Sequence, residues 1–99
     1  LTDAASIALD LSKGNSYSVT LGGSRTLANP TNATAGTAFR ISFKQDGTGG
    51  RTMSFGANYD TTGFTQLTGT ANKIQEVYFF VVSSSVIRVL ASNSAEFAN

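Results

Sequence analysis

The sequence predicts an all-β fold, an antiparallel β-sandwich with no significant helix, with a jelly-roll-like arrangement or a small barrel as the alternative. Three observations predict this fold. Apolar and polar residues alternate over several short segments, which is the period of a half-buried strand. Clusters of Gly, Asn, Ser and Asp separate these segments, as turns separate strands. Only 13% of the residues are charged, Thr and Ser make up about a quarter of the chain, and no stretch has the apolar spacing of an amphipathic helix.

A first hairpin is expected near the N-terminus. Residues 7–11 and 17–21 each alternate between apolar and polar side chains, and residues 12–15 between them are turn formers. A short strand around residues 25–27 follows, and then a surface loop at residues 29–32 that contains the single proline.

A second hairpin is expected to join residues 39–44 to residues 51–55. Apolar side chains occupy the odd positions of the first segment and polar ones the even positions, and the same period resumes in the second segment. The glycine-rich segment 45–50 reverses the chain between them. Residues 56–72 indicate a long loop with one short strand, and loops of that length are often functional.

A third hairpin differs from the others because it is apolar on both faces. Residues 77–82 form a continuous apolar run, residues 86–90 are apolar around Arg88, and serines at 83–85 form the turn. Either the hairpin is central within one chain, or a neighbouring subunit covers its second face. We expect the second arrangement, in a homotrimer. The expected interface residues are Val77, Phe79, Val81, Ile87 and Val89, with an ion pair between Arg88 and Glu76.

Length and composition limit the possible functions. Ninety-nine residues fit a single domain, residues 1–99, and the missing initiator methionine suggests a part of a longer polypeptide. A net charge of +1 provides no field that would hold nucleic acid. No apolar run approaches the roughly twenty residues that a membrane helix needs. The chain contains no His and no Cys, which removes the commonest general base, thiolate nucleophiles, zinc sites and disulfides.

We therefore expect no catalytic residue, no metal site and no cofactor. The six carboxylates are scattered over loop and solvent-facing positions, whereas a glycosidase needs two carboxyl groups that flank a cleft. The segment 46–50 could hold a cation or a phosphate, but it lacks a second carboxylate at calcium-loop spacing and the lysine of a phosphate loop. A tight turn capped by Asp46 is the better interpretation.

Several segments together resemble one known family. Residues 7–11, 21–32, 45–56 and 70–74, followed by the apolar hairpin, are similar in sequence and order to a module near the C-terminal ends of bacteriophage tail-fibre and related virion proteins. The resemblance extends to about residue 90. It implies a virion structural protein, usually a homotrimeric fibre whose distal part touches the bacterial surface, and no catalysis in this module. It also implies that residues 1–99 are the C-terminal part of a longer fibre chain.

The chain departs from the family pattern between Tyr59 and Leu67, where the family often carries Gly-Gly-Thr followed by a proline. This loop offers aromatic rings for stacking and hydroxyl, amide and carboxylate groups for sugar hydroxyls. The expected ligand-binding residues are Asn58, Tyr59, Asp60, Thr61, Thr62 and Phe64. The alternative is that Tyr59 and Phe64 only close one end of the core.

The function expected from these observations is a trimeric tip of a phage tail fibre or similar appendage that attaches to the host cell surface. Its partners would be its own copies, other virion proteins and a bacterial surface glycan or outer-membrane protein, without nucleic acid and without membrane insertion. The alternative is a purely structural trimerisation module, or a capsid or baseplate decoration module, that binds no receptor. A polysaccharide hydrolase is the least favoured possibility.

Overall fold

The strands lie in two sheets that face each other across the core. The computed structural model describes residues 1–62, 64–67, 69–92 and 97–98. The elements are β1 (Ser6–Ile7), η1 (Leu11–Lys13), β2 (Ser16–Leu21), β3 (Arg25–Leu27), β4 (Ala38–Gln45), β5 (Met53–Phe55), β6 (Tyr59–Asp60), β7 (Lys73–Ser83), β8 (Val86–Ser92) and β9 (Phe97–Ala98). Within the described ranges the fold is all-β apart from the single 3₁₀ turn η1, which confirms the all-β class and the absence of significant helix but not the antiparallel sandwich.

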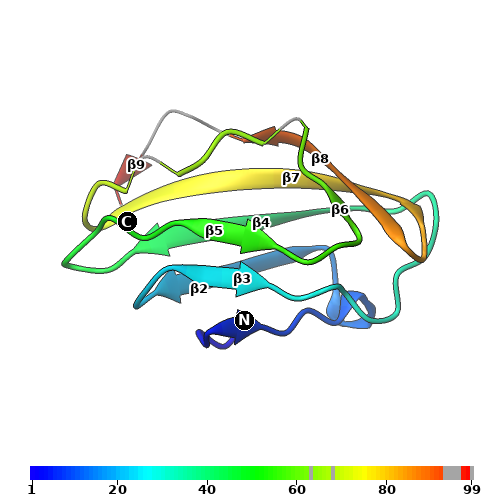
Figure 1. Cartoon of the computed structure of the whole chain (residues 1–99), viewed down its shortest axis with the longest axis horizontal. Helices are drawn as coiled ribbons and strands as arrows, with labels where there is room; N and C mark the ends of the chain where they lie inside the picture. The colour runs from blue at the N-terminus through cyan, green and yellow to red at the C-terminus, as the bar shows by residue number, and fades with distance from the viewer. Residues whose placement is uncertain (63, 68, 93–96, 99) are drawn as a thin grey trace.

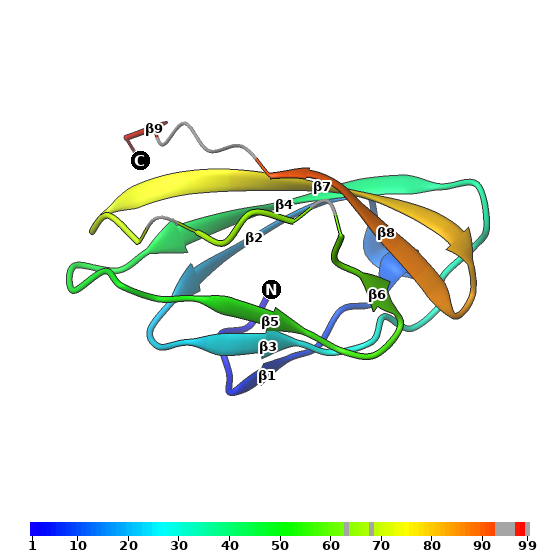
Figure 2. The same cartoon turned by 45° about the horizontal axis from the view of Figure 1, so that its top comes forward.

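The first five strands alternate between the two sheets. One sheet has the order β1-β3-β5 and the other β2-β4-β7-β8-β6, with β9 beside β7 (Figure 1). Figure 2 shows the first of these as a separate layer opposite β2, β4 and β7. Each strand pairs in parallel with the strand two places along the chain: β1 with β3, β2 with β4, and β3 with β5. The chain therefore follows a solenoid-like path.

This path overturns the first two expected hairpins and the purely antiparallel arrangement. A β-turn within one sheet would have paired β2 with the strand before it, but η1 carries the chain across to the opposite sheet. The Asp10 carboxylate begins this crossing, because its Oδ1 accepts a hydrogen bond of 2.9 Å from the Ser12 backbone N–H. The segment 45–50 likewise leads from β4 in one sheet to β5 in the other.

The third hairpin is confirmed. Strand β7 pairs antiparallel with β8 and also with β4, so it lies inside its sheet with a hydrogen-bonded neighbour on each side. Strand β6 pairs in parallel with β8. The sheet is consequently mixed. Strands β4, β7 and β8 form its antiparallel part, and β2 and β6 pair with it in parallel at the two edges.

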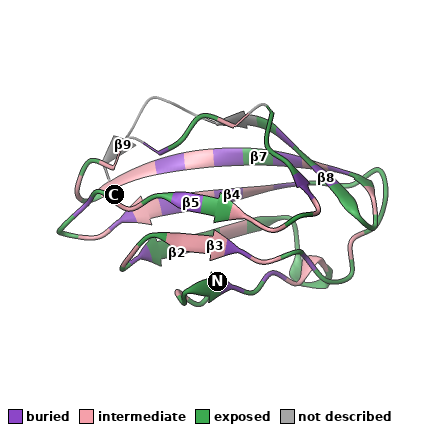
Figure 3. Cartoon of the chain, viewed as in Figure 1, coloured by how far each residue is buried: buried purple, intermediate pink, exposed green. Residues whose placement is uncertain are grey.

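The core lies between the sheets and follows the predicted alternation. In β4 the side chains of Phe39, Ile41 and Phe43 are buried while their neighbours are only partly covered, and β7 shows the same pattern (Figure 3). At the centre of the core, the rings of Phe39 and Phe79 stack with centroids 4.6 Å apart and an interplanar angle of 7°. Side chains from the opposite sheet, such as Leu27, complete the core with zero exposure.

Candidate functional site

The aromatic residues of the expected binding loop belong to the core. The Tyr59 ring packs edge-on against Phe79 with centroids 6.0 Å apart, and its hydroxyl donates a 2.9 Å hydrogen bond to the Ala28 carbonyl. Burial raises the pKa of the Tyr59 phenol. Phe64 packs edge-to-face on Phe55 at 4.8 Å. Both rings therefore pack on the core, with Tyr59 buried and Phe64 partly buried.

The polar residues of the same loop are at the surface. The carboxylate of Asp60 accepts hydrogen bonds from the Thr62 hydroxyl at 2.7 Å and the Thr62 backbone N–H at 3.1 Å, and these bonds lower the pKa of Asp60. Asp60 lies opposite Arg88 in the β6–β8 pair, and the two residues line a small hollow of about 180 Å³. Thr61 is exposed, while Asn58 is half-buried and its carbonyl accepts from the Ile87 backbone N–H.

The five apolar residues expected at a subunit seam lie inside the chain's own core. They have exposed fractions of 4% or less, and they are Val77, Phe79, Val81, Ile87 and Val89. Side chains with so little exposed surface have no contact area to offer a second copy in this structure. A neighbouring molecule would instead meet the alternate residues of β7 and β8.

Those alternate residues form an exposed apolar surface, which we call the outer face. Four of its side chains are 41–50% exposed, and Phe80 between them is half-covered. Phe80 also lies opposite Arg88 in the strand register. The four exposed members are Tyr78, Val82, Val86 and Leu90. Contiguous exposed apolar side chains are typical of interaction surfaces. The sequence signal for this face was the continuous apolar run at residues 77–82. Because odd and even positions are both apolar there, the run did not indicate which of the two faces outward.

The expected ion pair between Arg88 and Glu76 is not formed. The Glu76 carboxylate pairs with Arg40 of β4, because Glu76 lies opposite Ser42 in the register while Arg88 lies farther along the hairpin, opposite Phe80. Arg88 is instead close enough to Asp60 to lower the pKa of that carboxyl group electrostatically. The Arg40–Glu76 pair marks the end of the apolar part of the outer face.

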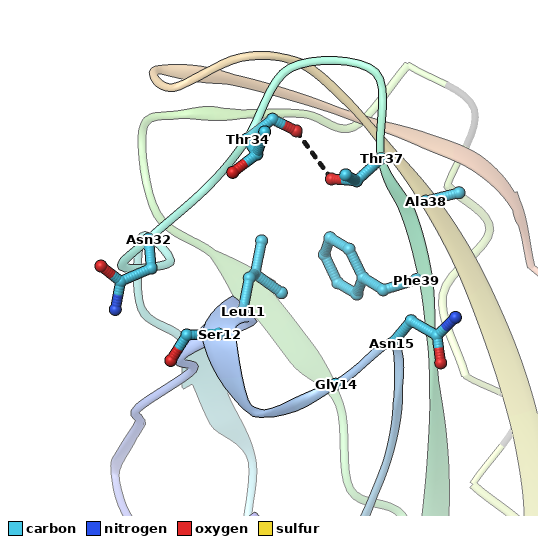
Figure 4. Close-up of a pocket in the computed structure, with 9 residues that line it drawn as sticks. All are labelled: Leu11, Ser12, Gly14, Asn15, Asn32, Thr34, Thr37, Ala38 and Phe39. Atoms are coloured by element: carbon cyan, nitrogen blue, oxygen red, sulfur yellow. Dashed lines mark hydrogen bonds between the residues drawn. The ribbon is translucent and has the colours of Figure 1, made fainter.

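A hollow of about 500 Å³, which the sequence did not predict, lies at one end of the molecule between η1 and the loop that precedes β4 (Figure 4). We call it the end hollow. Leu11 and Phe39 point into it as an apolar floor (Figure 4). The remaining lining residues are small or polar: Ser12, Gly14, Asn15, Asn32, Thr34, Thr37 and Ala38. No charged residue is among them.

Other polar side chains of the described chain stabilise turns. Asp46 caps its own loop by accepting from the Thr48 and Gly49 backbone N–H groups, as expected, and it pairs with Arg51 at 2.9 Å. Across residues 1–62, 64–67, 69–92 and 97–98, no three potential ligands from His, Cys, Asp and Glu come together in a possible metal site. The same residues contain no helix with the length and apolarity needed to cross a membrane.

Comparison with known proteins identifies the family. No curated protein and no solved structure matches the chain. One family model does, over residues 5–81, and its description is "Putative phage tail fibre C-terminal domain". The match includes the solenoid-like part and most of β7. The chain therefore belongs to the phage tail-fibre C-terminal domain family, and it is a structural domain of a virion tail appendage.

Proposed function

We propose that the chain forms a homotrimeric tip of the tail fibre and attaches the particle to the bacterial surface. The observation that carries the proposal is the outer face of β7 and β8, where Tyr78, Val82, Val86 and Leu90 remain 41–50% exposed beside a well-packed core. Membership of a tail-fibre family supports the same proposal. In a cyclic homo-oligomer every subunit buries the same set of residues, so one exposed apolar face on each chain can supply all of the contacts.

Burial of the outer face would stabilise an assembly. Fully burying a Leu, Val or Phe side chain contributes about 1.5–3 kcal/mol, so covering the half-exposed residues contributes on the order of 1 kcal/mol each. Each subunit of a trimer repeats this contribution. The remaining charge on this face, Arg88, lies between Val86 and Leu90 on β8 and opposite Phe80. Asp60 is beside it in the β6–β8 pair, so a partner that covers this face covers a charge with an opposite charge next to it.

Attachment would use the loops that stay at the surface. The ligand is a bacterial surface glycan or an outer-membrane protein, and the groups available in the loop after β6 are the exposed polar side chains of Asp60, Thr61 and Thr62. A trimer repeats each weak site three times on one rigid tip. Simultaneous engagement of linked sites raises the overall affinity by orders of magnitude, about 10²–10⁴.

Light scattering on the purified chain tests the trimer. We expect a solution mass of three times the 10.3 kDa chain mass at micromolar concentration. Leu90→Lys places a charge in the outer face and should shift the protein to monomers, while Thr20→Lys on the exposed, polar β2 should leave the mass unchanged. Far-UV circular dichroism checks that each variant keeps its strands. A monomeric wild-type chain under these conditions would overturn the trimer.

A second candidate is a purely structural trimerisation or decoration module that contacts only other virion proteins. The burial of Tyr59 favours it, because this ring is not available for stacking on a ligand, and Phe64 is partly covered by its packing on Phe55. Adsorption of the fluorescently labelled chain to a panel of bacterial strains separates the candidates. Saturable adsorption to at least one strain supports attachment, and adsorption to none supports the structural role.

A further inference from the structure

We infer that the end hollow binds a neutral saccharide unit of the bacterial surface. The inference rests on the proposed attachment function and moves its ligand site away from the loop after β6. The hollow lies where segments far apart in the sequence meet: η1 and the two residues before β2, the loop at residues 32–37, and the start of β4 (Figure 4). Its volume of about 500 Å³ is within the range of small-ligand sites, about 300–1,000 Å³.

The walls of the end hollow are held in place before any ligand arrives. The Asn32 side-chain amide donates a 2.8 Å hydrogen bond to Asp10, and the Leu11 backbone N–H donates to the Thr31 carbonyl at 3.0 Å. On the other side, the Thr37 hydroxyl donates to the Thr34 carbonyl at 2.7 Å (Figure 4). A site with preformed walls loses little conformational entropy when it binds.

The loop at residues 32–37 is also anchored to the body of the protein. The Gly36 backbone N–H donates to the Val81 carbonyl at 2.8 Å, and the Val81 N–H donates to the Thr37 carbonyl at the same distance. The loop is thereby joined to β7, so the far wall of the end hollow has the support of a central strand of the larger sheet.

The chemistry of the lining selects the ligand class. A sugar ring presents apolar C–H faces and a rim of hydroxyl groups. The end hollow presents the partly exposed Leu11 side chain, with the largely buried Phe39 ring behind it, below hydroxyl and amide groups. Within the described residues, the Asn15 and Thr34 side chains make no hydrogen bond to the protein, so both can bond to a ligand. An anionic ligand would find no cationic side chain in the lining.

A neighbouring hollow of about 550 Å³ fits this ligand class less well. It is lined in part by Asp10 and Lys13, which are both charged, and Asp10 already accepts hydrogen bonds from Ser12 and Asn32. The hollow beside Arg88 is smaller, about 180 Å³, and is also charged. The end hollow combines sufficient volume with a neutral lining.

Titration of the ¹⁵N-labelled chain with neutral methyl glycosides of glucose, galactose, N-acetylglucosamine and rhamnose tests the inference. At least one should shift the backbone amides of residues 11–15 and 32–39 with a dissociation constant in the millimolar range. The double variant Asn15→Ala, Thr34→Val removes two hydrogen-bonding groups and should weaken binding about tenfold or more. The matched control Thr20→Val removes an exposed hydroxyl on β2, outside the lining of the end hollow, and should leave binding unchanged.

The result that overturns the site is distinct from the result that overturns attachment. No shift with any neutral glycoside, or shifts confined to residues 60–62 and 88–90, rules out the end hollow. Labelled chain is applied in parallel to the panel of bacterial strains. If the wild type and the double variant adsorb equally, attachment stands and the end hollow is not the site. If glycosides bind there but the chain adsorbs to no strain, the site stands and the attachment function fails.

Discussion

Phe79→Ala is expected to be among the most damaging substitutions in the core. The Phe79 side chain has zero exposure and is in ring contact with residues of both sheets. It stacks on Phe39 within its own sheet and meets Phe55 of the other sheet edge-on at 6.2 Å. Truncation to alanine therefore removes apolar burial and the ring contacts that join the two layers.

The expected loss follows from the burial. Truncating a fully buried Phe typically costs about 3–5 kcal/mol, because the cavity is only partly refilled. Aromatic pairs contribute about 0.5–1.5 kcal/mol beyond area burial, which puts this site in the upper part of that range. A loss of about 4 kcal/mol in a chain of this size lowers the melting temperature by roughly 15–30 °C. Domain stabilities are about 5–15 kcal/mol, so the variant is expected to be marginally folded.

Urea unfolding followed by far-UV circular dichroism measures this loss, since the chain has no tryptophan to report by fluorescence. The matched control is Phe80→Ala, which removes the same ring from the adjacent residue on the outer face. In a trimer the stability depends on protein concentration, so both variants are measured at two concentrations. Phe79→Ala should lose stability equally at both, whereas Phe80→Ala should lose mainly the concentration-dependent part. A loss below about 1 kcal/mol for Phe79→Ala would show that the ring does not join the layers.

Three other substitutions test the turns of the chain. Gly49→Ala should lower the free energy of unfolding by more than about 1 kcal/mol, because the φ angle of Gly49 is +71° and a Cβ there would lie 2.5 Å from a backbone oxygen. The control Gly47→Ala has open space around the new Cβ and should be nearly neutral in the same urea assay. The hydrogen bond from Arg51 is the main cause that lowers the pKa of Asp46 to about 2. The stability that the Asp46 carboxylate contributes is therefore fully present above its unfolded pKa of 3.8 and is lost as the pH falls through 2. Asp46→Asn should remove that dependence from urea midpoints measured between pH 2 and 5. Gln45→Ala leaves the Arg51 backbone N–H and carbonyl unpaired and should cost about 2 kcal/mol or more, whereas an unchanged midpoint would contradict this pairing.

Sequence periodicity predicted the orientation of side chains well. In β4 the alternation of Phe39, Ile41 and Phe43 with polar neighbours corresponds to buried and partly covered positions in the structure. The third hairpin was also predictable, because only a three-serine turn separates its long strands. These are local properties: the pleat sets which side a residue faces, and a short turn leaves little choice of pairing partner.

Pairing between strands farther apart could not be read from periodicity. Alternation in residues 16–21 shows that one side of β2 is buried, but it contains no information about whether β1 or β4 lies beside it. The decisive element is η1, a three-residue 3₁₀ turn whose signal is Asp10 followed two residues later by Ser12. The same residues are equally compatible with a hairpin turn, so a hairpin was the expected outcome.

The candidate site was partly predictable for a related reason. The sequence located polar groups at Asp60, Thr61 and Thr62, which the structure leaves at the surface. It could not locate the end hollow, because that hollow depends on η1 and the loop at residues 32–37 meeting across the solenoid-like path. Aromatic residues in a loop were weak indicators of binding here, since a small core needs rings such as Tyr59 to close its end.

The apolar character of both faces of β7 and β8 is the feature on which the proposed assembly rests. The outer surface of the larger sheet is continuous from β2 to β8, yet it is polar over β2 and β4 and apolar over the hairpin. Scattered exposed apolar residues would need no explanation, but Tyr78, Val82, Val86 and Leu90 lie on one face of two paired strands. Because both alternating sets are apolar, periodicity could not decide which one faces the core. The choice of the Phe79 set for the core leaves the Tyr78 set exposed, so the same sequence run supplies both the folding core and the surface on which the proposed contact between subunits rests.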